Sequence, residues 1–167
     1  MKTLHKILLI VIIVCVCVGC DQATKVIAKQ HLAQSPPINL MNGMVILRYI
    51  ENQGSFLGLG AKLSDTVRFW LFIVLATLMV VGMLGFALTV QELNVVGITG
   101  AALVVGGGVG NLIDRITHQG AVVDFLNVGI GKVRTGIFNL ADVAIMAGIG
   151  VLLLAMYKPK STEDSDV

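Results

Sequence analysis

Three stretches of this chain are each long enough and apolar enough to cross a lipid bilayer as a helix. Residues 69–91 and 93–113 carry no charged side chain over 23 and 21 residues, and residues 137–157 carry one, Asp142. A helix needs about 20 apolar residues to cross about 30 Å of hydrocarbon. Only 13% of the residues are charged, against about 25% in soluble domains. The sequence therefore predicts an integral membrane protein.

The N-terminal segment allows two interpretations. An apolar run of 14 residues, 7–20, follows basic residues and ends in Gly19 and Cys20. A bacterial lipoprotein precursor has this pattern at its cleavage site, with the cysteine as lipid acceptor. The run becomes a membrane span if the helix continues through residues 21–29, which contain no Pro or Gly. We expect this continuation, because a cleaved lipoprotein would be mostly soluble and three long apolar spans follow.

Four spans would place both chain termini on one side of the membrane. Lys2 and Lys6 favour a cytoplasmic N-terminus, because short cytoplasmic loops are rich in Lys and Arg. The simple count opposes this orientation, since Lys158 and Lys160 bring that side to four basic residues against eight on the other. The eight are Lys25, Lys29, Arg48, Lys62, Arg68, Arg115, Lys132 and Arg134. We still predict a cytoplasmic N-terminus, because several of the eight belong to a candidate site.

The segment 38–65 between the first two spans is predicted to form a small extramembrane insertion. The Ser-Pro-Pro sequence at 35–37 ends the first helix. The sequence "GMVILRYIENQGSFLGLG" predicts a strand followed by a glycine-rich turn, and the strand suits a small sheet on the membrane surface. Ser64 or Asp65 is expected to cap the second helix.

The rest of the chain contains no second domain and no repeat. Residues 114–136 are expected to form a polar, glycine-dotted loop, and residues 161–167 a disordered tail. The prediction is one four-helix transmembrane domain over residues 1–160. A net charge of +2 gives no indication of nucleic-acid binding.

Polar side chains gather in and near the predicted spans, where they are expensive unless they face protein or water. They are therefore candidates for function. The candidates are Asp21, Lys25, Asn52, Gly54, Asn111, Asp114, Arg115, Asp124, Asn139 and Asp142.

Several candidates also have a purely structural interpretation. Asp21 and Lys25 can form an i,i+4 ion pair at a helix end. The sequence from Asn52 to Gly54 can be a plain hairpin turn. Asp114 can pair with Arg115, and Asp142 can be a carboxylate favoured by the start of a helix. The glycines at 106–110 are better explained by close helix packing than by phosphate binding, because no GK[ST] sequence follows them.

Two aspartates stand out because antiparallel packing of the third and fourth spans would bring them to the same membrane surface. Asp124 lies just beyond the third span, and Asp142 shares a helix face with Asn139 at the start of the fourth. Two close carboxylates do not both ionise readily, so one holds a proton while the other acts as a base. Such a pair activates water as in aspartic proteases. It requires no metal or cofactor, and the sequence contains no HExxH or GxSxG motif.

The motifs "DQATK", "NQGSFLG", "GGGVGNLIDR", "VVDF" and "FNLAD", in this order among four spans, resemble those of the lipoprotein signal peptidase (signal peptidase II) family. The resemblance covers roughly residues 7–157 and implies an intramembrane aspartyl endopeptidase of the bacterial inner membrane. It also implies a small extramembrane sheet and a short surface helix. Members cut diacylglyceryl-modified prolipoproteins just before the lipidated cysteine and are blocked by globomycin.

By the same resemblance, Asp124 and Asp142 are the catalytic residues. Asp114 would give structural support, and the loop from Asn52 to Gly58 would close over the substrate. The implied substrate-binding residues are Asp21, Lys25, Asn52, Gly54, Asn111, Arg115 and Asn139. The expected partners are lipidated prolipoproteins, membrane lipid and globomycin-type inhibitors, and the expected state is a monomer with its site at the extracytoplasmic face.

Two other classes remain open from the residues alone. A small transporter or channel would distribute its polar residues along a path through the bilayer, whereas these map to one end of the spans. A multi-span lipoprotein would be cut before Cys20, and that cut would remove the helix carrying Asp21 and Lys25.

Overall fold

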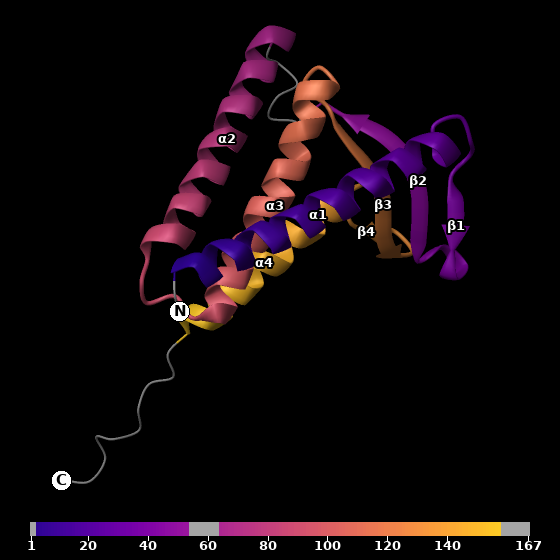
Figure 1. Cartoon of the computed structure of the whole chain (residues 1–167). Helices are drawn as coiled ribbons and strands as arrows, with labels where there is room; N and C mark the ends of the chain where they lie inside the picture. Colours follow the sequence, from indigo (N-terminus) through magenta and orange to yellow (C-terminus); the bar gives the residue numbers. More distant parts are fainter. Residues whose placement is uncertain (1–2, 54–63, 158–167) are drawn as a thin grey trace, which may run out of the picture.

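The computed structural model describes residues 3–53 and 64–157, and this part of the chain forms four long helices with a small sheet at one end (Figure 1). The helices are α1 (Thr3–Leu32), α2 (Asp65–Thr89), α3 (Val95–Thr117) and α4 (Leu140–Met156). The strands are β1 (Ile38–Leu40), β2 (Val45–Asn52), β3 (Val122–Ile130) and β4 (Val133–Arg134), with a 3-10 turn at Met41–Gly43.

Helix α1 runs unbroken for 30 residues and passes straight through Cys20. The predicted continuation of the first helix is therefore confirmed. Its last turns carry Asp21 and Lys25 into the protein, where both are buried, and it ends at Leu32 ahead of the Ser-Pro-Pro sequence. The segment that resembles a lipoprotein cleavage site is thus one continuous helix with the residues that follow it.

Within residues 3–53 and 64–157, three helices are long and apolar enough to cross a membrane: α1, the 21 residues Phe69–Thr89 of α2, and α3. Side chains along α1 and α2 leave many large apolar groups exposed, as expected for surfaces that face hydrocarbon. The predicted fourth span forms the shorter helix α4, whose 17 residues extend about 25 Å. The fold is mostly helical, and the expected four spans are matched by three long helices and one at the lower length limit.

The helix starts follow local capping chemistry. Ser64 caps α2 by accepting the backbone N–H of Val67, as predicted from the sequence. Asn94 caps α3 through a 2.9 Å bond from the N–H of Gly97. At the other end of α2, the Lys6 amine donates to the carbonyl oxygens of Leu88 and Val90, where a cation complements the helix C-terminus.

The four strands form one antiparallel sheet in the order β1-β2-β3-β4. The expectation of a polar loop over 114–136 was wrong, because α3 extends to Thr117 and residues 122–130 are strand β3. The first four residues of β3 are buried, and Phe125 packs with Ala28 and Leu32 of α1. Apolar burial against α1 therefore stabilises a strand whose one glycine and two polar residues make it hard to recognise from the sequence.

The predicted insertion over 38–65 contributes β1, the 3-10 turn and β2 to the sheet. That turn is the short helical element of the insertion within the described residues. Residues 54–63, which include Gly54 and most of the predicted closing loop, lie outside the described part of the chain.

Helices α3 and α4 approach each other closely through glycines. A Cβ atom added at Gly100 would lie 2.8 Å from the carbonyl oxygen of Gly148, and one added at Gly107 would collide with the carbonyl oxygen of Ala141. Small residues at such interfaces let two backbones meet without intervening side chains. Ala141 precedes Asp142, so this contact also sets the position of the first turn of α4.

Replacing Gly107 with Ala should destabilise the protein, because the added methyl group meets rigid backbone and forces α4 to shift. We expect a loss of about 1–3 kcal/mol in the free energy of unfolding, measured in detergent micelles. The matched control is Gly82→Ala on α2, where an added Cβ meets nothing within 4 Å and should be neutral or mildly stabilising. Equal stability of the two variants would contradict the packing argument.

Candidate active site

Asp124 and Asp142 line the same cavity, which has a volume of about 610 Å³. Asp124 lies in the buried half of β3 and Asp142 in the first turn of α4, so a strand and a helix each supply one carboxylate. Three other predicted site residues line this cavity: Asn52, Asn111 and Arg115. Sequence reasoning did not single out its apolar walls, which include Phe72, Phe138, Ile145 and Met146.

Asp142 is held by two hydrogen bonds at the N-terminus of α4. Its Oδ1 accepts from Asn111 Nδ2 at 2.9 Å, and its Oδ2 accepts from the backbone N–H of Asn139 at 3.2 Å. The Asn139 side chain in turn accepts the N–H of Asp142 at 2.9 Å, which completes a capping box. The structural interpretation of Asp142 as a helix-start carboxylate is therefore correct, but the same group also faces the cavity.

Asp124 is almost fully buried, with 3% of its surface exposed. Its Oδ1 accepts from Asn139 Nδ2 at 2.7 Å, and its Oδ2 accepts from Asn52 Nδ2 at 2.9 Å. Burial raises the pKa of Asp124 from its ordinary value to about 6. The hydrogen bond from Asn52 opposes this shift, and the charge of Asp142 adds to it. Asp124 therefore holds a proton at a higher pH than an exposed aspartate does.

Asn139 links the two carboxylates and is completely buried. Its backbone and side chain cap α4 through Asp142, while its Nδ2 contacts Asp124 and lies 3.0 Å from Asn111 Oδ1. One amide thus sets the position of both acids. The sequence showed that Asn139 and Asp142 share a helix face, but not that this face meets β3.

A buried ionic group lies behind the cavity. The Lys25 ammonium is 2.7 Å from Asp21 Oδ2 and 2.8 Å from Asp114 Oδ2, and the three side chains are 1–4% exposed. Lys25 also donates to Asn111 Oδ1 at 3.1 Å. The predicted pair of Asp21 and Lys25 is present, whereas the ion pair of Asp114 is with Lys25 and not with the suggested Arg115.

The ionic group connects α1 and α3 with α4 and β3. Asp21 accepts the N–H of Ala141 in α4 at 2.9 Å, and Asp114 accepts the N–H of Val123 in β3 at 2.9 Å. Gln22, which sequence reasoning did not single out, donates to Asp114 Oδ1 at 2.9 Å. Its position beside Asp21, where α1 changes from apolar to polar sequence, was the available signal. Asp21 and Lys25 therefore support the site from behind instead of lining the cavity.

The guanidinium of Arg115 is partly buried and makes few hydrogen bonds within the described residues. Its Nη1 donates to the backbone oxygen of Asn111 at 3.2 Å, whereas its Nε is buried and has no hydrogen-bond partner within residues 3–53 and 64–157. An unsatisfied buried donor is unfavourable unless a ligand accepts from it. Arg115 is thus suited to bind an oxygen atom of a molecule in the cavity.

Within the described residues, no three His, Cys, Asp or Glu side chains are grouped so as to hold a metal ion. The polar side chains that line the cavity are those of Asp124, Asp142, Asn52, Asn111, Arg115 and Thr135.

Comparison with known proteins identifies the family. The sequence profile described as "Signal peptidase (SPase) II" matches residues 13–158, which is most of the chain. The chain belongs to the signal peptidase II family. It is therefore a peptidase by family and a membrane protein, and the resemblance drawn from its motifs is confirmed.

Curated relatives agree with this assignment to the signal peptidase II family. The lipoprotein signal peptidase of Halalkalibacterium halodurans is 33% identical over 138 residues, covering 83% of this chain and 85% of the relative. That of Treponema denticola is 34% identical over 153 residues, with 87% and 88% covered. That of Clostridioides difficile is 32% identical over 150 residues, with 90% and 94% covered.

Solved structures extend the likeness from sequence to fold. A bacterial membrane enzyme determined by the in meso method at 2.3 Å resolution matches with a TM-score of 0.76 and 25% identity. The match covers 98% of this chain and 94% of that one. A second such structure, at 1.9 Å resolution, gives a TM-score of 0.75. The likeness of the helices and sheet to these solved structures thus extends over nearly the full length of this chain.

Proposed function

We propose that this protein cleaves signal peptides from diacylglyceryl-modified prolipoproteins just before the lipidated cysteine, using Asp124 and Asp142 to activate water. The observation that carries the proposal is the convergence of two carboxylates on one cavity, joined by the amide of Asn139. Family membership supplies the peptidase activity, and the relatives named lipoprotein signal peptidase indicate the substrate class.

In the proposed mechanism Asp142 is the base and Asp124 the acid. The raised pKa of Asp124 favours its protonated form and suits it to the role of acid, which leaves Asp142 as the base. Water attacks the scissile carbonyl carbon and passes a proton to Asp142, while Asp124 protonates the carbonyl oxygen. When the C–N bond breaks, the proton on Asp142 goes to the leaving amine, and Asp124 recovers a proton from the diol.

The neighbouring polar groups take positioning and binding roles in this proposal. Asn111 and Asn139 hold the carboxylates through the bonds described above. Arg115, with its unsatisfied Nε–H, donates to a substrate backbone carbonyl or to a lipid ester oxygen. The apolar walls formed by Phe72, Ile145 and Met146 suit the signal peptide and the acyl chains.

The proposed setting is the bacterial inner membrane, with α4 as a fourth span and the cavity at the extracytoplasmic face. The buried polar and charged side chains of the described residues all lie around the sheet-bearing end: Asp21, Lys25, Asn111, Asp114, Asp124 and Asn139. At the opposite end, an apolar core joins all four helices through Ile10, Ala87, Ile98 and Leu152. A transport path would need polar groups at both ends, so this distribution favours chemistry at one surface.

The proposal is tested with the purified protein and a diacylglyceryl-modified precursor in detergent. We expect a product shorter by the signal peptide on a denaturing gel, with the new N-terminus at the lipidated cysteine by mass spectrometry. Globomycin should block the reaction. The same precursor without its lipid is the matched control and should remain uncut. Cleavage of both precursors alike would contradict the assignment to lipidated substrates.

The pH dependence provides a further test of the acid. Asp124 must be protonated to act, so kcat/KM should fall as the pH rises through its pKa of about 6. Replacing Asn52 with Ala removes a bond that stabilises the ionised carboxylate, so the pKa rises and the alkaline limb should move to higher pH. The measurement is cleavage rate from about pH 4.5 to about pH 9 for both proteins. An alkaline limb at the same pH in both would exclude Asp124 as its source.

A further inference from the structure

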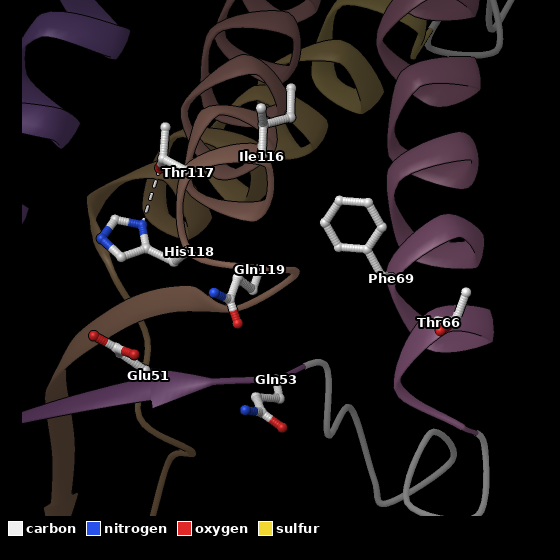
Figure 2. Close-up of a pocket in the computed structure, with 8 residues that line it drawn as sticks. All are labelled: Glu51, Gln53, Thr66, Phe69, Ile116, Thr117, His118 and Gln119. Atoms are coloured by element: carbon white, nitrogen blue, oxygen red, sulfur yellow. Dashed lines mark hydrogen bonds between the residues drawn. The ribbon is translucent and has the colours of Figure 1, made fainter.

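A second hollow of about 710 Å³ lies between β2, the start of α2 and the end of α3 (Figure 2). It is separate from the cavity of the two aspartates, and the mechanism above makes no use of it. Its lining is mostly polar and includes Glu51, Gln53, Thr66, Phe69, Thr117 and His118.

The hollow and the aspartate cavity are separate but follow each other along the same two helices. On α2, Phe72 lines the cavity and Phe69, one turn nearer the N-terminus, lines the hollow. On α3, Arg115 lines the cavity and Thr117 lines the hollow, nearer the C-terminus. The two helices are joined by a short turn and run antiparallel, so both steps lead toward the same end of the molecule, the end that carries the sheet (Figure 1).

Strand β2 forms the boundary between the two spaces. Side chains alternate along a strand, and Asn52 faces Asp124 while Glu51 and Gln53 face the hollow. In Figure 2 the Glu51 carboxylate extends from β2 and lies on the same side of the hollow as the His118 ring. A peptide that extends from the two aspartates past the end of β2 would therefore next contact the face of β2 that carries Glu51 and Gln53.

The lining of the hollow indicates which part of a substrate fits. The aspartate cavity has walls of Phe72, Ile145 and Met146, whereas the hollow has hydroxyl, amide, imidazole and carboxylate groups with Phe69 on one side. Polar surroundings suit a hydrated peptide and not an acyl chain. In a prolipoprotein, the chain beyond the cysteine is the part that points away from the membrane.

We propose that this hollow receives the residues that follow the lipidated cysteine, and that Glu51 selects against acidic side chains there. The inference rests on the proposed function and adds a specificity determinant to it. Glu51 is the acidic side chain of the hollow, and the described lining contains no Lys or Arg to neutralise it. The Tyr49 hydroxyl donates to Glu51 Oε1 at 2.7 Å and fixes the carboxylate without cancelling its charge. A charge at the rim of a binding site contributes mainly to discrimination between ligands.

The experiment compares lipidated precursors that differ only in the two residues after the cysteine, which are both Ser, both Lys or both Asp. We expect the wild-type protein to cleave the Lys precursor about two- to fivefold faster than the Asp precursor, in kcat/KM at low salt. Glu51→Gln should remove the preference and Glu51→Lys should reverse it. Raising the salt concentration to about 0.5 M should shrink it, because the charges are exposed.

Tyr49→Phe is the matched control, since it removes the hydrogen bond to Glu51 and keeps the charge. Its preference should equal that of the wild type, and each preference is taken as the ratio of Lys to Asp cleavage within one protein. A preference that is absent from the wild type, or unchanged in Glu51→Lys, overturns the inference while leaving the proposed function intact. Failure of the wild type to cleave even the Ser precursor overturns both.

Discussion

Replacing Asp142 with Asn should lower the rate of prolipoprotein cleavage at least about 10³-fold. An amide of the same shape retains one acceptor for Asn111 or the Asn139 N–H, so α4 keeps most of its cap. It accepts no proton from water, and this is the property that the proposed mechanism requires. The measurement is single-turnover cleavage of a diacylglyceryl-modified precursor by purified protein.

Asp124→Asn should give a loss of similar size, because the amide has no acidic proton to donate to the carbonyl oxygen. The double variant should be no worse than either single one, since the two acids act as a unit. Glu92→Gln is the control for both, because it removes an exposed carboxylate from the turn between α2 and α3, at the other end of the molecule, and should leave cleavage unchanged. Near-normal turnover in either aspartate variant, at an unchanged thermal midpoint, would exclude the pair as the catalytic group.

Lys25→Met should be the most damaging single substitution for stability. It leaves Asp21 and Asp114 buried at 1% exposure without the ammonium that lies between them. Removing one partner of a buried ionic group costs about 3–5 kcal/mol, because the remaining charge is uncompensated. Thermal unfolding in detergent micelles should show the loss directly, and activity should fall with the folded fraction.

The triple variant Asp21→Asn, Lys25→Met and Asp114→Asn separates charge from packing. It removes all three charges and keeps acceptor oxygens for the N–H groups of Ala141 and Val123. We expect it to recover most of the stability lost in Lys25→Met, since neutralising a buried ionic group as a whole is far less harmful than breaking it. If the triple variant is as unstable as Lys25→Met, the lysine acts through its hydrocarbon chain and not through its charge.

The sequence predicted the long helices and drew attention to the polar residues near their ends, because both signals are local. Length and the absence of charge define α2 and α3, and the lack of Pro or Gly after Cys20 carries α1 onward. The identity of the aspartates came from motif order. Their convergence on one cavity followed from antiparallel spans, which the α3–α4 packing bears out.

What the sequence did not predict depends on contacts between distant segments. Strand β3 contains two polar residues and a glycine, and it is recognisable only once β2 and α1 cover it. Lys25 and Asp114 are 89 positions apart, so nothing local distinguishes this pair from the neighbouring Arg115. The sequence also did not predict that Asn52 lines one cavity and Glu51 a separate hollow. That distinction depends on which face of β2 each side chain occupies.

The position of Asn139 has a consequence for when the protein becomes active during its biogenesis. Its amide reaches Asp124 only after α4 has its first turn and β3 has paired with β2. A chain that has inserted its helices but not closed the sheet holds one acid without the other. Under the proposed mechanism such a chain cannot cut, so proteolytic activity is the last property to emerge during assembly.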